Sequence, residues 1–177
     1  MPRLDGTLES LRRWDAWLCL RMNAGLRFGG VLHFFRAVSW LGNGIFWYAL
    51  MLALLVRDAA EALQPVLHMA AVGAACTITY SLLKRSTLRP RPYQVVAAVR
   101  RGAVPLDAFS FPSGHTLHAV AFTLVALVHY AALAPVLIPF TLLIAASRVV
   151  LGLHYPSDVL VGAAVGAITA AVSFNLL

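Results

Sequence analysis

The stretch from Ser147 to Asp158 places three groups capable of chemistry between two long apolar runs. Arg148 can clamp an oxyanion because its guanidinium is a planar fork of donors. His154 can act as a nucleophile or carry a proton near neutral pH. Asp158 can orient that imidazole and stabilise its charged form. Since ionisable groups at the end of a membrane segment are expected to be functional, the combination indicates chemistry on an oxyanion, with phosphate the leading candidate.

Two further clusters contain groups that suit a phosphate. In the run Lys84–Pro92, positive side chains can neutralise phosphate charge, and the prolines stiffen the exit from a helix. In the run 111–115, Phe-Pro-Ser-Gly-His, backbone N–H groups at a predicted helix start favour an anion. His115 can donate a proton to a leaving oxygen there. Each cluster alone also fits a structural role, as a basic juxtamembrane loop or as a capped turn.

The composition places these clusters in a membrane. The chain of 177 residues is 60% hydrophobic and 12% charged, with a mean hydropathy of +0.79, whereas soluble domains carry about 25% charged residues. Its net charge of +7 suits anionic lipid head groups or a phosphate substrate. Nucleic acid is a poor partner, because the basic residues flank apolar segments. Cys19 and Cys76 lie in apolar surroundings, which favours free thiols.

Apolar runs predict an all-α integral membrane protein, because lipid cannot satisfy the edge of a strand. The expected transmembrane helices are Val38–Val56, Val66–Leu83, His115–Ala132, Pro135–Val150 and Val159–Leu177. Residues 1–37 are expected to form an amphipathic interfacial segment or a degraded first crossing, which would make six. Residues 38–177 form the predicted transmembrane domain.

Counting these crossings brings the three clusters to one membrane face. The second predicted helix ends at Lys84, the third begins at His115, the fourth ends at Arg148 and the fifth begins at Asp158. The active site is therefore expected at that face. A metal site is disfavoured, because no set of His, Asp and Glu has the spacing of metal ligands. The remaining histidines are interpreted as packing or interfacial residues, namely His33, His68, His118 and His129.

The three clusters together resemble a known signature. Lys84 is followed after six residues by Arg91-Pro92, then comes Pro112-Ser113-Gly114-His115, and then Ser147-Arg148, five residues, His154, three residues and Asp158. This order and spacing are similar to the three-part signature of the type 2 phosphatidic acid phosphatase superfamily. That superfamily includes lipid phosphate phosphatases, undecaprenyl pyrophosphate phosphatases, glucose-6-phosphatase and the vanadium haloperoxidases. The resemblance makes residues 38–177 a transmembrane lipid phosphatase domain.

The resemblance implies a role for each matching residue. His154 would be the nucleophile that forms a phosphohistidine, Asp158 would hold it in the productive tautomer, and His115 would protonate the leaving lipid oxygen. The phosphate-binding residues would be Lys84, Arg91, Ser113, Gly114 and Arg148. Phosphoryl transfer gains mostly from positioning and charge stabilisation, so neither a metal nor another cofactor is expected. The partners are the bilayer and a lipid phosphate or pyrophosphate: undecaprenyl pyrophosphate, phosphatidylglycerol phosphate, phosphatidic acid or a lipid A phosphate.

Three alternatives compete with a hydrolase. A lipid phosphotransferase would use the same pocket and pass the phosphate to another lipid, and the sequence does not separate it from a phosphatase. A vanadate-dependent haloperoxidase would use a similar pocket, but the resembling enzymes are soluble and larger. A non-catalytic lipid binder or transporter would not require His154, Asp158 and His115 together.

The orientation in the membrane meets two opposing arguments. Nearly all basic residues lie on the predicted active-site face or in the segment attached to it, so the positive-inside rule would make that face cytoplasmic. The resemblance implies a bacterial inner-membrane protein whose site faces the periplasm or the cell exterior. Several of these charges are expected phosphate ligands and are a biased sample for the rule. If residues 14–36 cross the membrane, the conflict becomes smaller.

Overall fold

The computed structural model describes residues 2–176, and every regular element within that range is helical, which confirms the all-α class. The longer helices are α1 (Pro2–Asn23), α2 (Gly29–Trp40), α3 (Phe46–Asp58), α4 (Leu63–Thr87), α6 (Gly114–His129), α7 (Ala134–Val150) and α8 (Pro156–Ser173). The short helical segments are η1 (Ala24–Arg27), η2 (Leu41–Ile45), η3 (Ala59–Ala62), α5 (Pro92–Val95) and η4 (Ala131–Leu133). Met1 and Leu177, the ends of two predicted segments, lie outside the described residues.

Helices α4, α6, α7 and α8 occupy the last four runs that the sequence predicts as crossings. The first predicted run, Val38–Val56, begins in α2, passes through the irregular turn η2 and continues in α3. By length and composition, three helical stretches of the described chain can span a membrane: Gly29–Val95, Ala131–Val150 and Pro156–Ser173. Helix α6 is apolar but shorter. The first stretch holds the α3–α4 hairpin, where Ala59 adopts a φ of 47°. The number of crossings therefore stays a prediction.

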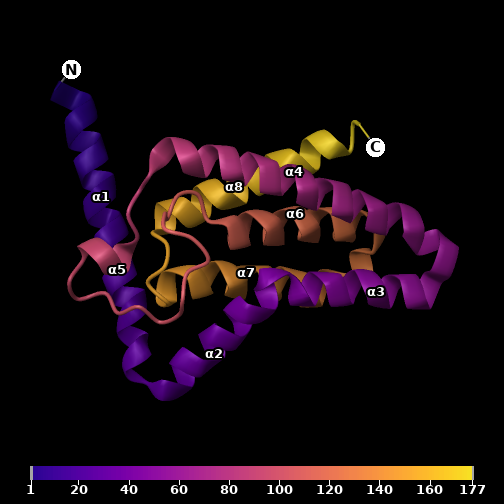
Figure 1. Ribbon diagram of the computed structural model, residues 1–177, viewed down its shortest axis with the longest axis horizontal. Helices are drawn as coiled ribbons and strands as arrows, with labels where there is room; N and C mark the ends of the chain where they lie inside the picture. Colours follow the sequence, from indigo (N-terminus) through magenta and orange to yellow (C-terminus); the bar gives the residue numbers. More distant parts are fainter. Residues whose placement is uncertain (1, 177) are drawn as a thin grey trace.

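The five helices form a bundle with both helix hairpins at one end and the connecting loops at the other (Figure 1). Helix α1 runs across the loop end instead of alongside the bundle (Figure 1). Helix α2 begins at Gly29, ahead of the predicted boundary at residue 38, and continues into α3 through the irregular turn η2. Where α1 and α2 lie relative to a bilayer stays a prediction.

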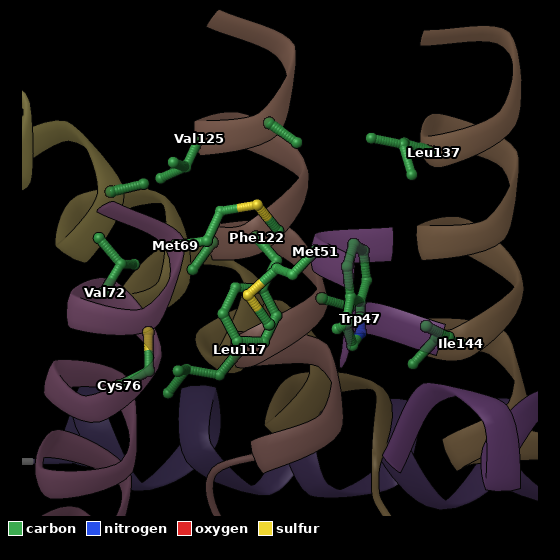
Figure 2. Packing of buried hydrophobic residues seen from close by; sticks show 14 of the residues in the cluster. Trp47, Met51, Met69, Val72, Cys76, Leu117, Phe122, Val125, Leu137 and Ile144 are labelled. Carbon is green, nitrogen blue, oxygen red and sulfur yellow. The ribbon is translucent and has the colours of Figure 1, made fainter. Parts of the chain in front are cut away.

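Helix α6 lies at the centre of the core. Figure 2 shows Leu117, Phe122 and Val125 of α6 among buried side chains of the neighbouring helices. The labelled neighbours are Trp47, Met51, Met69, Val72, Cys76, Leu137 and Ile144. This packing fixes the first turn of α6, and hence His115, relative to α3 and α4.

Two glycines of α8 let it approach α6 closely. A Cβ atom at Gly162 would lie 2.6 Å from the carbonyl oxygen of Ser113, and one at Gly166 would clash with the carbonyl oxygen of Leu117. Small residues spaced four apart are typical of such close helix contacts in membranes. The backbone N–H of Ser113 also donates to the carbonyl of Asp158 over 3.1 Å. The starts of α6 and α8 are thereby joined, although the sequence separates them widely.

Candidate active site

The eight predicted site residues come together at the loop end of the bundle. There α4 ends, α6 begins, α7 ends and α8 begins (Figure 1). Loop 96–113, which connects α5 to α6, folds over this end (Figure 1). The convergence expected from counting helices is the arrangement that the structure has.

The turn from α7 into α8 is shaped by a left-handed glycine. Gly152 has a φ of 71°, a conformation that favours glycine because it has no Cβ. The carbonyl of Arg148 accepts from the backbone N–H groups of both Leu153 and His154, each over 3.1 Å. Helix α8 then starts with a proline in its first turn, where the missing N–H costs nothing. The turn therefore sets His154 just ahead of α8.

His154 is held by a backbone carbonyl. Its Nδ1 lies 2.5 Å from the carbonyl oxygen of Ser110, and the side chain is buried, with 2% of its surface exposed. Because a carbonyl oxygen can only accept, Nδ1 must carry the proton and Nε2 the lone pair. That Nε2 lies 3.3 Å from Nη1 of Arg91. The unprotonated nitrogen of the ring therefore faces the guanidinium of Arg91.

The surroundings of His154 favour its neutral form. Burial lowers the pKa of His154 well below its ordinary value, and the nearby charges of Arg148 and Arg91 lower it further. Lys84 and His115 act in the same direction. A group with a lowered pKa loses its proton at a lower pH, so the imidazole of His154 is neutral near pH 7.

Asp158 lies beside His154 without a hydrogen bond to it. Its Oδ2 is 3.9 Å from Nδ1 of His154, beyond hydrogen-bonding distance. That oxygen instead accepts from the backbone N–H of Tyr155 over 2.8 Å, and Oδ1 accepts from Nη1 of Arg89 over 2.6 Å. The sequence analysis expected Asp158 to fix the tautomer of His154. In the structure the hydrogen bond that fixes this tautomer goes to the carbonyl of Ser110. The catalytic role of Asp158 stays a prediction, and its carboxylate is near enough to stabilise a charged imidazole.

Lys84 and Arg91 converge on an acid that the sequence did not indicate, Asp107. Lys84 Nζ lies 2.6 Å from Oδ2 of Asp107, and Arg91 Nη2 lies 2.8 Å from Oδ1. Tyr80 donates its hydroxyl to Oδ2 over 2.7 Å. A carboxylate and a phosphate present similar oxygens to cations, so the Asp107 side chain marks a place where these two cations bind an oxyanion.

Asp107 is charged at physiological pH. Although burial acts to raise the pKa of Asp107, the hydrogen bonds from Lys84 and Tyr80 and the charges of Lys84 and Arg91 hold it below its ordinary value. The charged carboxylate of Asp107 thus lies between Lys84 and Arg91, the two cations that are predicted to bind phosphate. A phosphate bound there would share these cations with Asp107 or displace its carboxylate.

The remaining phosphate-binding candidates are Arg148 and Ser113, which are buried, and Gly114, which is partly buried. Arg148 donates through Nη1 to the hydroxyl of Ser39, while its buried Nε has no partner among the described residues. An unsatisfied buried donor calls for an acceptor, and a phosphate oxygen is suitable. Ser113 caps the start of α6, where its hydroxyl bonds that of Thr116 over 2.9 Å. Gly114 opens the same helix.

A cavity of about 420 Å³ leads away from the start of α6. Its polar end is lined by His115, Gly114 and Tyr80. The apolar part runs between α3, α4 and α6 and is lined by residues that include Trp47 and Met51. His115 thus lines the polar end of this cavity, and its catalytic role stays a prediction.

The sequence did not indicate a role for four residues that contact this site: Arg89, Asp107, Ser110 and Asp15. Asp107 had a weak signal, since it is the only acidic residue in the loop 96–113. Arg89 lies inside the basic run that was singled out, but its partner was not apparent. Ser110 acts through its backbone carbonyl, so its side-chain type carried no signal.

Comparison with known proteins places these residues in a family context. The sequence model of the PAP2 superfamily matches residues 61–177. Decaprenylphosphoryl-5-phosphoribose phosphatase of Mycobacterium tuberculosis is 34% identical over 144 residues, which cover 81% of this chain and 78% of that protein. The residues that the family model matches include all eight predicted site residues.

Two solved structures share the fold. The crystal structure of LpxE from Aquifex aeolicus superposes with a TM-score of 0.76 at 27% identity, over 92% of this chain and 95% of that one. A transmembrane PAP2-type phosphatidylglycerolphosphate phosphatase from Bacillus subtilis superposes with a TM-score of 0.74 at 21% identity, over 94% and 86% of the two chains. The second likeness supports the helical fold alone.

Proposed function

This chain belongs to the PAP2 superfamily, and from that premise we propose that it dephosphorylates a lipid phosphate or pyrophosphate without a metal, through a phosphohistidine on His154. It is an integral membrane protein and a hydrolase of lipid phosphates. Beyond this activity, we propose the mechanism, the class of lipid substrate and the side of the membrane that the active site faces. The observation that carries the mechanism is the pairing of a neutral imidazole with a cation, His154 Nε2 at 3.3 Å from Arg91 Nη1.

The proposed reaction has two displacements. His154 Nε2 attacks phosphorus, an N–P bond forms, and the P–O bond to the lipid breaks. His115 gives its proton to the departing lipid oxygen. Water then attacks phosphorus, His115 takes a proton from it, and the N–P bond breaks to release inorganic phosphate. Lys84, Arg91 and Arg148 compensate the negative charge of the transferred group throughout, so no metal is required.

The cavity supports a substrate with a long apolar chain. It extends from His115 along α3 and α4 and ends among apolar side chains such as Trp47 and Met51. Apolar lining with a few polar groups at one end suits an amphiphile. The curated relative is named for a decaprenyl-linked substrate, and undecaprenyl pyrophosphate or a similar polyprenyl phosphate is the class that we favour for this chain.

Phosphate release by the purified protein in detergent tests the proposal. We expect release in the presence of EDTA from at least one lipid of a panel that includes a polyprenyl phosphate, a polyprenyl pyrophosphate, phosphatidylglycerol phosphate and phosphatidic acid. A water-soluble sugar phosphate is the control. We expect it to be hydrolysed more slowly, because it has no apolar chain to fill the cavity. Loss of release in EDTA would contradict the metal-free mechanism. Transfer of labelled phosphate to a second lipid would identify a phosphotransferase.

We propose that the active site faces the periplasm or the cell exterior of a bacterial inner membrane. Ala98 lies exposed in the loop that covers the site, and Ala60 lies exposed in the turn between α3 and α4, at the opposite end of the bundle. In intact spheroplasts, Ala98→Cys is expected to react with a membrane-impermeant maleimide, while Ala60→Cys reacts only after lysis. Both native cysteines are buried, so the background is low. The reverse pattern would place the site in the cytoplasm.

A further inference from the structure

Helix α1 contributes a buried carboxylate to the start of α8. Asp15 is 1% exposed. Its Oδ1 accepts from the backbone N–H of Ser157 over 2.9 Å, and its Oδ2 accepts from the Ser157 hydroxyl over 2.5 Å. A carboxylate at a helix N-terminus satisfies backbone donors that have no partner within the helix and matches the helix dipole. Asp15 therefore caps α8, although it belongs to a helix distant in sequence.

The sequence of α1 is arranged for this contact. Asp15, Cys19 and Asn23 are four residues apart and are all buried, so they share one face of the helix. Cys19 packs in a cluster with Val149, and Asn23 donates to the carbonyl of Val150 over 2.8 Å. This face of α1 is thus packed against the end of α7, directly ahead of the turn that carries His154.

Arg89 connects Asp15 to Asp158. Its Nη2 lies 2.8 Å from Oδ2 of Asp15, and its Nη1 lies 2.6 Å from Oδ1 of Asp158. Nη1 also lies 2.9 Å from the hydroxyl of Ser157. The guanidinium stacks over the ring of Tyr155 at 4.1 Å. A planar fork can reach two carboxylates at once and hold both in a defined direction, which an ammonium cannot do.

The contact with Arg89 sets the orientation of the Asp158 carboxylate. Asp158 is fully buried, and its two oxygens have different partners. Arg89 holds Oδ1, and this leaves Oδ2 on the side of Tyr155 N and of His154 Nδ1. Two buried carboxylates near one another also require a positive charge, and Arg89 supplies it.

We propose that Asp15 and Arg89 are positioning residues for phosphoryl transfer: α1 fixes Arg89, and Arg89 turns Asp158 toward His154. Neither residue needs to touch the substrate. The inference rests on the proposed function, because it assumes that His154 becomes charged in the reaction and that Asp158 stabilises that charge. A loss of this orientation acts on the transition state more than on substrate binding.

The test compares kcat and KM of Asp15→Asn, Arg89→Gln and Arg89→Lys with those of the wild type. We expect kcat to fall on the order of 10- to 100-fold in Asp15→Asn and in Arg89→Gln, with KM changed by no more than about twofold. Arg89→Lys is expected to retain more activity than Arg89→Gln, since it keeps the charge. The double variant Asp15→Asn/Arg89→Gln is expected to be no worse than the more impaired single variant, because the two act as one unit.

Glu9→Gln is the matched control. Glu9 lies on α1 as well, and its pairing with Arg13 at 3.7 Å is exposed to solvent, so this variant is expected to keep wild-type kcat. Rates are divided by the amount of folded protein, measured from thermal unfolding in detergent. Wild-type kcat per folded molecule in Asp15→Asn or in Arg89→Gln would overturn the inference. Activity in His154→Ala would instead overturn the proposed function, so the two failures are distinguishable.

Discussion

His154→Ala is expected to abolish phosphate release, with kcat reduced by a factor on the order of 10⁴ or more. The imidazole Nε2 is the atom proposed to bond to phosphorus, and alanine leaves no other nucleophile in its place. Residual hydrolysis would depend on water attacking a phosphate bound by the cations alone. The measurement is release of inorganic phosphate from the preferred lipid of the panel, in detergent and with EDTA present.

The same variant also tests for the covalent intermediate. Wild-type protein quenched in alkali during turnover of a labelled lipid is expected to retain phosphate on the chain, and His154→Ala is not. His33→Ala is the matched control, because His33 is exposed on α2 and bonds only the carbonyl of Gly29 among the described residues. Full activity of His154→Ala would mean that another residue attacks the phosphorus.

His115→Gln is expected to lower kcat for lipid phosphates by about 10²- to 10⁴-fold, the usual contribution of a general acid. The loss is expected to be much smaller for p-nitrophenyl phosphate, because nitrophenolate is stable without a proton. Glutamine occupies nearly the same volume and keeps the polar lining of the cavity. The informative quantity is the ratio of the two losses, measured on one preparation of the variant.

His129→Gln provides the control for this comparison. His129 ends the same helix, α6, but lies at the opposite end of the bundle, near His68. The substitution His129→Gln is expected to lower kcat only slightly, and by the same factor for both substrates. If His115→Gln slows both substrates by the same factor, His115 does not protonate the leaving group. A role in holding the phosphate would then explain its position at the start of α6.

The sequence determined the class of the protein, because lipid leaves few structural choices. Long uncharged runs must become helices in a bilayer. Four of the predicted runs are helices in the structure, and the first, Val38–Val56, is helical on both sides of the irregular turn η2. Motif spacing indicated phosphate chemistry, since Lys84, Arg148, His115 and His154 offer the cations and imidazoles that suit this chemistry. Counting helices then brought them to one end of the bundle. The helical boundary near residue 38 was less predictable, because α2 starts at Gly29 in a segment that mixes charged and apolar residues.

Only the tertiary structure decided which neighbouring groups form hydrogen bonds and ion pairs with the predicted site residues. Ser110 bonds His154 across 44 positions of sequence through its backbone, and every residue type has a carbonyl. Asp107 meets Lys84 and Arg91 because loop 96–113 folds back over the site, and no periodic pattern predicts the path of such a loop. Asp15 meets Ser157 across 142 positions. A buried carboxylate pairs with whichever donors the packing brings within about 3 Å, so its partners depend on how α1, the loop and α8 are packed together.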